Sequence, residues 1–472
     1  MTRWLTYLPQ ALRITLALWF FTICASLPAE SLVPPQKSAM GGIKHLASSV
    51  IDLNFAKGPP YYLRGATGPL TEGRSTPATC FDNAGNLIQV AAFVPCIAGG
   101  QLWSYEARTN TNPNNTMAGA GPGVWPTGWA TVGTINGLTT TIVGTGSSQG
   151  MTYLRINVAG TATATASQQF SVTNNAAAAA CAQNQVWSNT WQFRAVSGVQ
   201  PSWAIGVQDF TAGVAFIGGY QAVFTPTSSF APYTFNWLVP DATAALCNNI
   251  IYFAYNNTTT YNFTFDVAAP QFEKNPNATT AAQAFATPPI LTTNAAATRN
   301  ADNISLTVQS CTVASLLAIS SPVAPGANTT FQVAADLNDG TYNNRTYVGR
   351  SGSSSAGSSA VSNVYVSNYP AGTWAQNVSG KITVNQTSSL TSAAFNNGTV
   401  ASAASTAPIA KNKLSIGADP TGISQWNGGI SRVALACGSS LTSASNDAPA
   451  NDNDPRFAAL GDVTPTREPR VA

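Results

Sequence analysis

The chain has 472 residues and a formal net charge of +3, and only 8% of its residues are charged, although an ordinary 44% are hydrophobic. So little charge, with no basic stripe, excludes nucleic-acid binding by phosphate neutralisation and leaves neutral sugars and protein surfaces as ligand classes. Water-exposed helices need charged outer faces, whereas the plentiful Thr, Val and aromatic residues favour strands. The composition therefore predicts an all-β protein, and the length predicts two or three domains.

The first residues differ from the rest. Arg3 and Arg13 flank the start of an apolar run, residues 14–24, and small residues follow it. This layout is typical of a secretory signal peptide, here residues 1–29, and the run is too short to span a bilayer comfortably. We expect a secreted chain that has no membrane contact after signal removal. The alternative is a true start at Met40.

Removal of the signal leaves six cysteines, and the sequence alone does not choose among their pairings. None has C-x-x-C spacing and the one histidine is His45, which excludes a zinc site. Two cysteines fall in each module described below, which favours three bridges within modules; six buried thiols are the alternative for a chain kept in a cytoplasm. The candidate pairs are Cys80 with Cys96, Cys181 with Cys247, and Cys311 with Cys437.

Residues 30–115 are expected to form an extended N-terminal docking segment. Within it, "RSTPATCFDNAGNLIQVAAFVPC" predicts a β-hairpin, because residues 82–86 carry the Asp, Asn and Gly that tight turns need. The hairpin is followed by "YEARTN", in which Glu106 and Arg108 are two residues apart. We expect these two side chains to pair and to dock the segment against the next module or a neighbouring subunit.

Residues 116–290 show the alternation of a sheet with one buried face. Trp191 and Phe193 alternate with polar residues in "NTWQFRAV", and the same pattern recurs in "YTFNWLVP" and "TTYNFTFDV". Many short strands separated by turns predict a two-sheet sandwich of jelly-roll type.

Residues 303–445 predict a second sandwich. The stretch "FQVAADLNDGTYNNRTYVG" predicts strand, turn and strand, and "AAFNNGTVASA" predicts a hairpin turning at Asn397-Gly398. A loop and a closing strand are expected in "LSIGADPTGISQWNGGISRVALACG". Residues 446–472 are polar and rich in proline, as expected of a loose tail.

These motifs resemble bacteriophage tail-fibre and virion-fibre proteins, and the likeness covers residues 50–440. The elements that carry it are "RSTPATCFDNAGNL" with "YEARTN", then "PQFE", and finally "NDGTYNN", "FNNGTVAS" and "QWNGGISRVAL". Cys80 and Phe81 stand where that family has Tyr and its neighbour, and Thr111 replaces a Leu. Virion proteins of this kind carry no secretory signal, which leaves a relocated, prophage-derived copy or a wrong start as alternatives.

The resemblance implies a carbohydrate-binding-module-like jelly roll followed by a laminin-G/concanavalin-A-like domain. It implies a virion component or a secreted counterpart, with cell-surface polysaccharide or other virion proteins as partners. Such fibres are commonly homotrimers, although no heptad run in this chain supports a trimer independently.

The sequence offers little catalytic chemistry. Glucanases of concanavalin-like fold need two neighbouring carboxylates, but Glu72, Glu106, Glu273 and Glu468 each lie apart from other acids in such a pattern. A serine hydrolase would need a histidine base, and His45 has no partner signature. We therefore predict a protein that is not an enzyme.

Two groups of residues are candidate binding sites in the last module. Asp336, Asn338 and Asp339 carry oxygens suited to calcium, with a plain Asx turn as the alternative; we expect no other cofactor. Trp426 and Asn427, in the loop before the last strand, combine a stacking surface with an amide for sugar hydroxyls. Tyr347, Tyr369 and Trp374 are expected on the same side, and the alternative is that Trp426 plugs the end of the sandwich.

Taken together, the residues and the resemblance predict a non-enzymatic fibre or adhesin that displays β-sandwich loops to a cell-surface glycan. Multivalency would strengthen weak individual sites. Two rivals remain: a structural virion spacer that binds only other proteins, and an exported polysaccharide-degrading enzyme.

Overall fold

The computed structural model describes residues 49–57, 62–64, 66–82, 84–132, 136–173, 178–324, 331–351, 354–361, 364–368, 372–396, 400–404, 409–422 and 424–437. They belong to one compact unit, His45–Ala472. The predicted signal peptide, the alternative start at Met40, the Asn397-Gly398 turn and the C-terminal tail lie outside the described residues.

The described chain is all-β, as predicted. Its regular structure consists of strands and the one-turn 3₁₀ helix Ala281–Gln283. No helix in the described part of the chain is long and apolar enough to cross a membrane.

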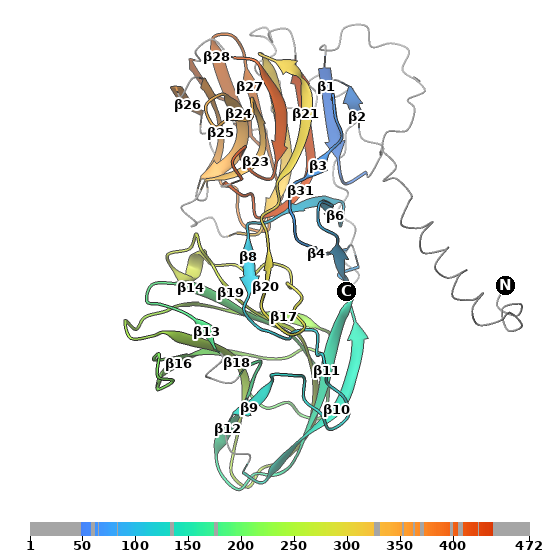
Figure 1. Cartoon of the computed structure of the whole chain (residues 1–472), viewed down its shortest axis with the longest axis vertical. Coiled ribbons are helices and arrows are strands. Elements are labelled where there is room, and N and C mark those ends of the chain that lie inside the picture. The colour runs from blue at the N-terminus through green and yellow to red at the C-terminus, as the bar shows by residue number, and fades with distance from the viewer. Residues whose placement is uncertain are drawn as a thin grey trace, which may run out of the picture. The chain divides into compact units, whose positions relative to one another are not determined.

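The middle sandwich is formed by two sheets (green and yellow in Figure 1). The first sheet has the order β10-β11-β19-β14-β17, with β8 beside β19 and β20 beside β8; the second has the order β16-β15-β18-β12-β9, with β13 beside β18. The strands of the first sheet are β8 (Arg108–Asn110), β10 (Leu138–Ser148), β11 (Met151–Thr161), β14 (Val186–Ser197), β17 (Ala231–Leu238), β19 (Thr260–Lys274) and β20 (Ala297–Arg299). The strands of the second are β9 (Ala130–Val132), β12 (Ala166–Ser171), β13 (Ala179–Ala180), β15 (Trp203–Phe210), β16 (Phe216–Phe224) and β18 (Leu246–Tyr255).

The core of the middle sandwich is mainly aromatic. Trp191 and Phe193 of β14 are fully buried, as their alternation predicts. The ring of Trp203, from the opposite sheet, lies 4.7 Å from Phe193 and 4.6 Å from Phe265 between centroids. Edge-to-face packing of this kind adds about 0.5–1.5 kcal/mol per pair to the stabilisation from burial. The core therefore fixes which face of β14 and β19 points outward.

The C-terminal sandwich also has two sheets, ordered β2-β1-β31-β22-β27-β28-β29 and β26-β25-β24-β23-β30-β21-β3. The first contains β1 (Ser49–Asn54), β2 (Tyr62–Arg64), β22 (Ala314–Pro322), β27 (Gly380–Gln386), β28 (Leu390–Phe395), β29 (Ala401–Ala404) and β31 (Gly428–Cys437), with β6 (Cys96–Ala98) and β7 (Gln101–Ser104) attached. The second contains β3 (Thr71–Glu72), β21 (Ile304–Cys311), β23 (Gln332–Asn338), β24 (Arg345–Ser351), β25 (Ser354–Val361), β26 (Val364–Asn368) and β30 (Lys411–Ile416). The predicted β23–β24 pair and the closing strand β31 are present.

The N-terminal segment is not a separate docking element, which corrects the expectation for residues 30–115. Strand β1 pairs with β31 along its whole length, from Ser49 opposite Cys437 to Asn54 opposite Arg432. Strand β7 pairs with the start of β31, and β3 pairs with β21. The C-terminal sandwich is thus built from both ends of the described chain, and the middle sandwich is inserted between them. Hydrophobic alternation indicates a strand but not its distant partner, so this pairing could not be predicted from the sequence.

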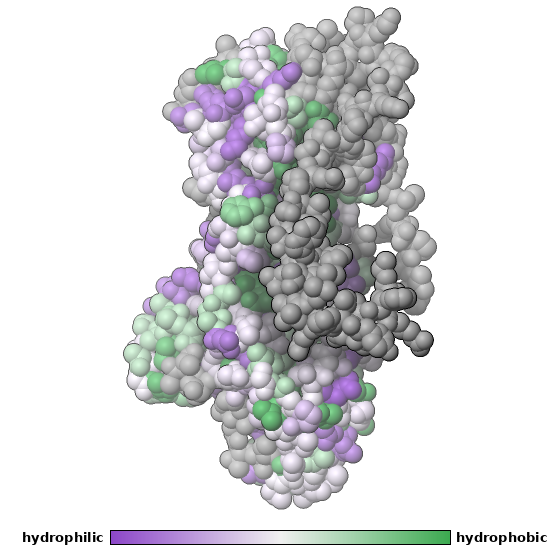
Figure 2. Space-filling model, turned by 45° about the vertical axis from the view of Figure 1, so that its right-hand side comes forward, coloured by the Kyte–Doolittle hydropathy of each residue, from purple (hydrophilic) through white to green (hydrophobic). Residues whose placement is uncertain are grey.

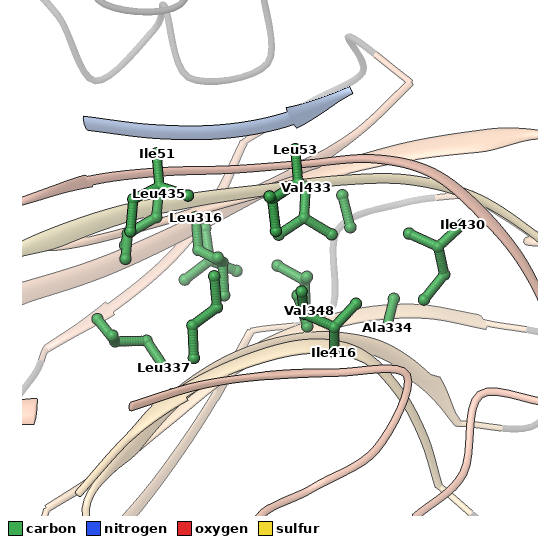
Figure 3. Packing of buried hydrophobic residues seen from close by; sticks show 14 of the residues in the cluster. Ile51, Leu53, Leu316, Ala334, Leu337, Val348, Ile416, Ile430, Val433 and Leu435 are labelled. Carbon is green, nitrogen blue, oxygen red and sulfur yellow. The ribbon is translucent and has the colours of Figure 1, made fainter. Parts of the chain in front are cut away.

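Packing between the sheets explains why β1 belongs there. Ile51 and Leu53 point inward beside Val433 and Leu435, and they face Leu337 and Ile416 of the opposite sheet (Figure 3). All six side chains are fully buried. On the other face of β1, Asp52 accepts hydrogen bonds from the Arg432 guanidinium at 2.9 and 3.2 Å. Complete burial of one such aliphatic side chain is worth about 1.5–3 kcal/mol.

The three predicted disulfides are present: Cys80 with Cys96, Cys181 with Cys247, and Cys311 with Cys437. The last joins β21 to the end of β31, and the first fastens the predicted hairpin, β4 (Ala78–Phe81) with β5 (Leu87–Val90). The hairpin turn is held by Asp82, whose carboxylate accepts the Asn86 N–H at 2.8 Å. Three bridges indicate folding in an oxidising, extracytoplasmic environment.

Candidate functional site

The aromatic residues proposed as sugar-stacking platforms are buried, which corrects that expectation. Trp426 and Trp374 have no exposed surface, and their rings are in contact, 4.7 Å apart. Tyr347 is 2% exposed and packs against Phe331. Trp426 closes the end of the C-terminal core, as the alternative held, because it lies in the same apolar cluster as Ile430 and Ala334.

Asn427 serves the backbone and not a ligand. It is 2% exposed, and its Oδ1 accepts the Glu106 N–H at 2.7 Å. Its φ of 53° lies in the left-handed region, which Asn tolerates better than most residues. Tyr369 lies outside the described residues.

The oxygens considered for calcium are engaged by protein donors. Asp336 is buried with its Oδ2 2.8 Å from Arg345 Nε, and burial raises the Asp336 pKa to about 7 in spite of that arginine. Asn338 Oδ1 accepts the Gly340 N–H at 2.9 Å, and Asp339 Oδ1 accepts the Thr341 N–H at 2.9 Å. This is the Asx-turn alternative. The described residues contain no group of three His, Cys, Asp or Glu side chains placed to hold a metal ion.

Glu106 and Arg108 form the predicted pair and join two parts of the fold. Arg108 Nε donates to Glu106 Oε1 at 2.8 Å, and its Nη1 donates to the Lys274 carbonyl at the end of β19 at 2.8 Å. The guanidinium also lies over the Phe285 ring, 4.7 Å from its centroid. Since Asn427 binds the Glu106 backbone, this short segment bonds to residues of both sandwiches.

Beside this segment lies a cleft of about 660 Å³, which is the candidate functional site. Its floor is the outer face of β14 and β17, and one wall is the chain of residues 284–289. Further walls come from the β4–β5 hairpin, from the end of β7 and from the C-terminal sandwich at Val323, Gln376 and Asn377. Most small-ligand sites are concave surfaces of about this size with a few polar groups among apolar ones.

The floor of the cleft carries hydroxyls and amides in a row. Thr190 and Thr234 face each other across the strand pair with their hydroxyls 3.0 Å apart. Asn236 is fixed, because its Oδ1 accepts from Ser188 at 2.7 Å and its Nδ2 donates to the Ala284 carbonyl at 3.0 Å. The Gln192 amide lines the cleft and has no hydrogen-bond partner among the described residues. Gln192 is 6% exposed, so the floor of the cleft holds a largely buried amide that has no protein partner in the described structure.

Aromatic side chains form the sides. Trp103 is half-buried and stacks parallel to Tyr105 with centroids 6.0 Å apart, and its Nε1 donates to the Ala98 carbonyl at 3.0 Å. Phe81 and Phe230 line the cleft from the hairpin and from the loop before β17. Because its indole is held at one edge, Trp103 presents a fixed apolar surface to the cleft.

The residues that line this cleft in the described structure carry no charge. Glu273 lies behind the wall, fully buried, and accepts from the Thr287 N–H at 2.6 Å and the Thr287 hydroxyl at 2.8 Å. Burial raises the pKa of Glu273. Its role in the structure is to hold the wall. On the face of the molecule drawn in Figure 2, hydrophilic residues lie in separate groups among less polar ones.

Sequence reasoning did not single out this cleft. Thr190 and Gln192 are the polar half of the alternation in "NTWQFRAV", and the alternation by itself indicates only which residues form the core. Trp103 lies two residues before the first residue of "YEARTN", and its local sequence does not mark it as a ligand contact. The available signal was a polar strand face rich in uncharged amides and hydroxyls. A strand face of this kind more often simply contacts solvent.

No protein-family model and no curated protein sequence matches the chain. Among solved structures it is similar to a carbohydrate-binding module of the β-sandwich superfamily, at 12% identity over 48% of this chain and 85% of that chain, with a TM-score of 0.28. It is also similar to a CBM4 module, at 13% identity over 35% of this chain and all of that one, with a TM-score of 0.25. Domains LG4-5 of mouse laminin α1 match at 7% identity over 52% of this chain and 81% of that one, with a TM-score of 0.21. Similarity of this degree carries no argument about function, and the fold class rests on the sheets themselves.

Proposed function

We propose that the chain is a non-enzymatic fibre- or adhesin-type protein that binds a cell-surface glycan in the cleft over β14 and β17. The observation that carries the proposal is the free amide of Gln192 on a floor of hydroxyls, with the flat face of Trp103 at its side. Sugar rings present apolar C–H faces that pack on aromatic rings, and hydroxyls that bond to amides. A cleft that combines both suits a glycan better than an apolar ligand.

Two further features support recognition without catalysis. Glycoside hydrolysis by the usual route needs two carboxyl groups on either side of the scissile bond. Asp and Glu are absent from the described lining, and Glu273 is enclosed behind it. The exported polysaccharide-degrading enzyme is therefore the weaker alternative.

We also propose a biological setting for this binding protein. The motif resemblance supports a phage tail-fibre or virion-like protein, or its secreted counterpart, and a homotrimer would multiply weak sites. The rival is a structural spacer that binds only other virion proteins. Three disulfides favour a chain that folds outside the cytoplasm.

The test is retention of the oxidised protein by polysaccharides in affinity gels, for the wild type and for Gln192→Leu. This substitution keeps the size of the side chain and removes its amide. Loss of the amide should weaken retention about tenfold, the effect of one or two hydrogen bonds. The matched control is Gln221→Leu on β16, an exposed glutamine of the other sheet.

The outcomes separate the alternatives. Retention that falls for Gln192→Leu and not for Gln221→Leu supports the cleft. A wild-type protein that no polysaccharide retains, but that assembles with virion proteins, favours the spacer. Release of reducing ends from a retained polymer would favour the enzyme.

A further inference from the structure

We propose that two arginines beside the cleft, Arg155 and Arg194, bind a carboxylate of the glycan, so that the ligand is an acidic, uronic-acid-containing polysaccharide. This inference rests on the proposed function and names its ligand class. It goes against the expectation of neutral sugars that the low overall charge suggests.

The two arginines share one buried carboxylate. Asp266 of β19 is directly opposite Arg155 of β11 on one side and Arg194 of β14 on the other. Arg155 donates to it through Nε at 2.8 Å and Nη2 at 3.0 Å. Arg194 donates through Nε at 2.7 Å. The Nη1 of each arginine has no hydrogen-bond partner among the described residues.

The pair therefore has one positive charge more than the carboxylate neutralises. It also differs from the other ion-paired arginines of the described chain in its exposure. The side chains of Arg155 and Arg194 are 32% and 23% exposed. The remaining ion-paired arginines are at most 7% exposed: Arg74, Arg108, Arg299, Arg345 and Arg432. Among these ion-paired arginines of the described chain, only Arg155 and Arg194 combine unused N–H donors with access to a ligand.

Aromatic rings hold the pair in place. The Tyr153 centroid lies 5.4 Å from the Arg155 guanidinium carbon and 5.0 Å from that of Arg194. Phe230 lies 4.6 Å from Arg194 on the same measure. A guanidinium held by a carboxylate and an aromatic face loses little further freedom on binding an anion. Tyr153 itself lies across Gly146, where a side chain would collide with its ring.

The pair adjoins the cleft. Phe230, under Arg194, is also a lining residue of the cleft. Arg194 follows Gln192 by two residues, which places both on the outer face of β14, about 7 Å apart along the strand. A chain of sugars whose ring stacks in the cleft and bonds to Gln192 would bring its next substituent to the arginines. Fork-shaped guanidinium groups match planar carboxylates in two-point contacts, which favours a uronic acid.

The experiment uses the full oxidised protein and affinity gels that contain polygalacturonate, hyaluronan or alginate. Gels with the same polymers after chemical reduction of their carboxyl groups to alcohols serve as the neutral counterparts, and dextran sulfate serves as the sulfated one. At least one uronic-acid polymer should retain the protein. Carboxyl reduction should weaken that retention about tenfold or more, and Arg194→Gln or Arg155→Gln should do the same.

Single substitutions are used because they leave Asp266 one partner, and thermal unfolding checks the fold. Lys57→Gln, at an exposed turn after β1, is the control for loss of one positive charge. Retention that is equal before and after carboxyl reduction, or equal for wild type and both arginine variants, overturns the inference. In those cases a loss with Gln192→Leu still supports glycan binding in the cleft. Retention by dextran sulfate alone would also overturn it.

Discussion

Arg350 of the C-terminal sandwich and the pair Arg155 and Arg194 of the middle sandwich lie in opposite surroundings. In the C-terminal sandwich, Arg350 is buried and donates to the Trp374 carbonyl at 2.9 Å, beneath the ring of Trp426. Burial lowers its pKa to about 10. In the middle sandwich, Arg155 and Arg194 lie on the outer face with part of each side chain in water. Residue type alone therefore does not mark a binding site, because the face of the sheet on which a residue lies decides whether it can contact a ligand.

The difference has a structural cause. The C-terminal sandwich must join strands from both ends of the described chain, and β1 is held in it by pairing with β31, by the ion pair of Asp52 with Arg432 and by inward packing. The large side chains of this sandwich are therefore needed in the core between its two sheets. The middle sandwich is formed from a continuous stretch and already has an aromatic core, so the outer face of its first sheet remains available for amides and arginines.

The largest expected effect is a loss of stability, and it should distinguish Trp426 from Trp103. Trp426→Ala should destabilise the protein by about 3–5 kcal/mol, because it leaves a cavity in a closed core. Trp103→Ala should cost clearly less stability, because Trp103 is half-buried, but it should remove the stacking surface of the cleft. Chemical unfolding and polysaccharide retention, measured on both variants, check the contrast.

Retention must be compared under conditions in which the Trp426→Ala protein is still folded. If folded Trp426→Ala lost retention while Trp103→Ala kept it, the binding surface would lie at the end of the C-terminal core that Trp426 closes, and not in the cleft beside Trp103. Equal losses of stability would show that Trp103 is as much a core residue as Trp426.

A smaller effect concerns a buried amine in the C-terminal sandwich. Lys411 Nζ donates to Gln386 Oε1 at 2.8 Å, and burial lowers the Lys411 pKa to about 8 from 10.5, in spite of Asp336 and Asp339 nearby. Between these two pH values the unfolded chain holds more protons than the folded one, so stability rises with pH, and the cost of burying the ammonium is fully present below pH 8. Lys411→Met should raise stability at pH 7 by about 1–3 kcal/mol and remove this rise.

Urea unfolding at pH 7, 8, 9 and 10 measures both parts of this prediction, with Lys413→Met on the same strand as the control. If the stability of wild type and of Lys411→Met changed in parallel with pH, burial would not lower the pKa of the Lys411 amine. The Lys411→Met substitution is expected to leave the middle sandwich unchanged.

The sequence predicted the fold better than it predicted the site. Alternating aromatics in residues 189–196 identified β14 and its buried face, because burial leaves a period of two in the sequence. The cysteines paired within modules as their distribution suggested. The same local reasoning could not assign β1 to the C-terminal sandwich, since its partner is nearly 380 positions away, as the contact of Asp52 with Arg432 shows.

The site could not be predicted from the sequence for a related reason. Trp426 in an Asn- and Gly-rich loop has the local pattern of an exposed platform, yet it is fully buried and in contact with Trp374 and Arg350 from distant segments. Gln192 and Arg194 look like the solvent face of a strand, and only the approach of Phe230 and residues 284–289 makes a cleft beside them. Concavity is a property of the assembled fold, and no spacing within one strand encodes it.

The smallest expected effect on stability, and the sharpest on the comparison, comes from Gly146→Ala. A Cβ at this position would lie 2.3 Å from the Tyr153 hydroxyl, so the ring must move, while the φ of Gly146 suits any residue. Because the obstacle is the end of a flexible side chain on an exposed face, stability should change by no more than about 1 kcal/mol. The displaced ring would no longer lie against the two arginines, and retention by the acidic polymer should fall. Gly213→Ala, in the turn before β16, is the matched control, because a Cβ there would lie 3.8 Å from Thr211 Oγ1, an ordinary contact. Unchanged retention for Gly146→Ala would mean that Asp266 alone orients the arginines, and that the aromatic rings of the outer face only cover the sheet.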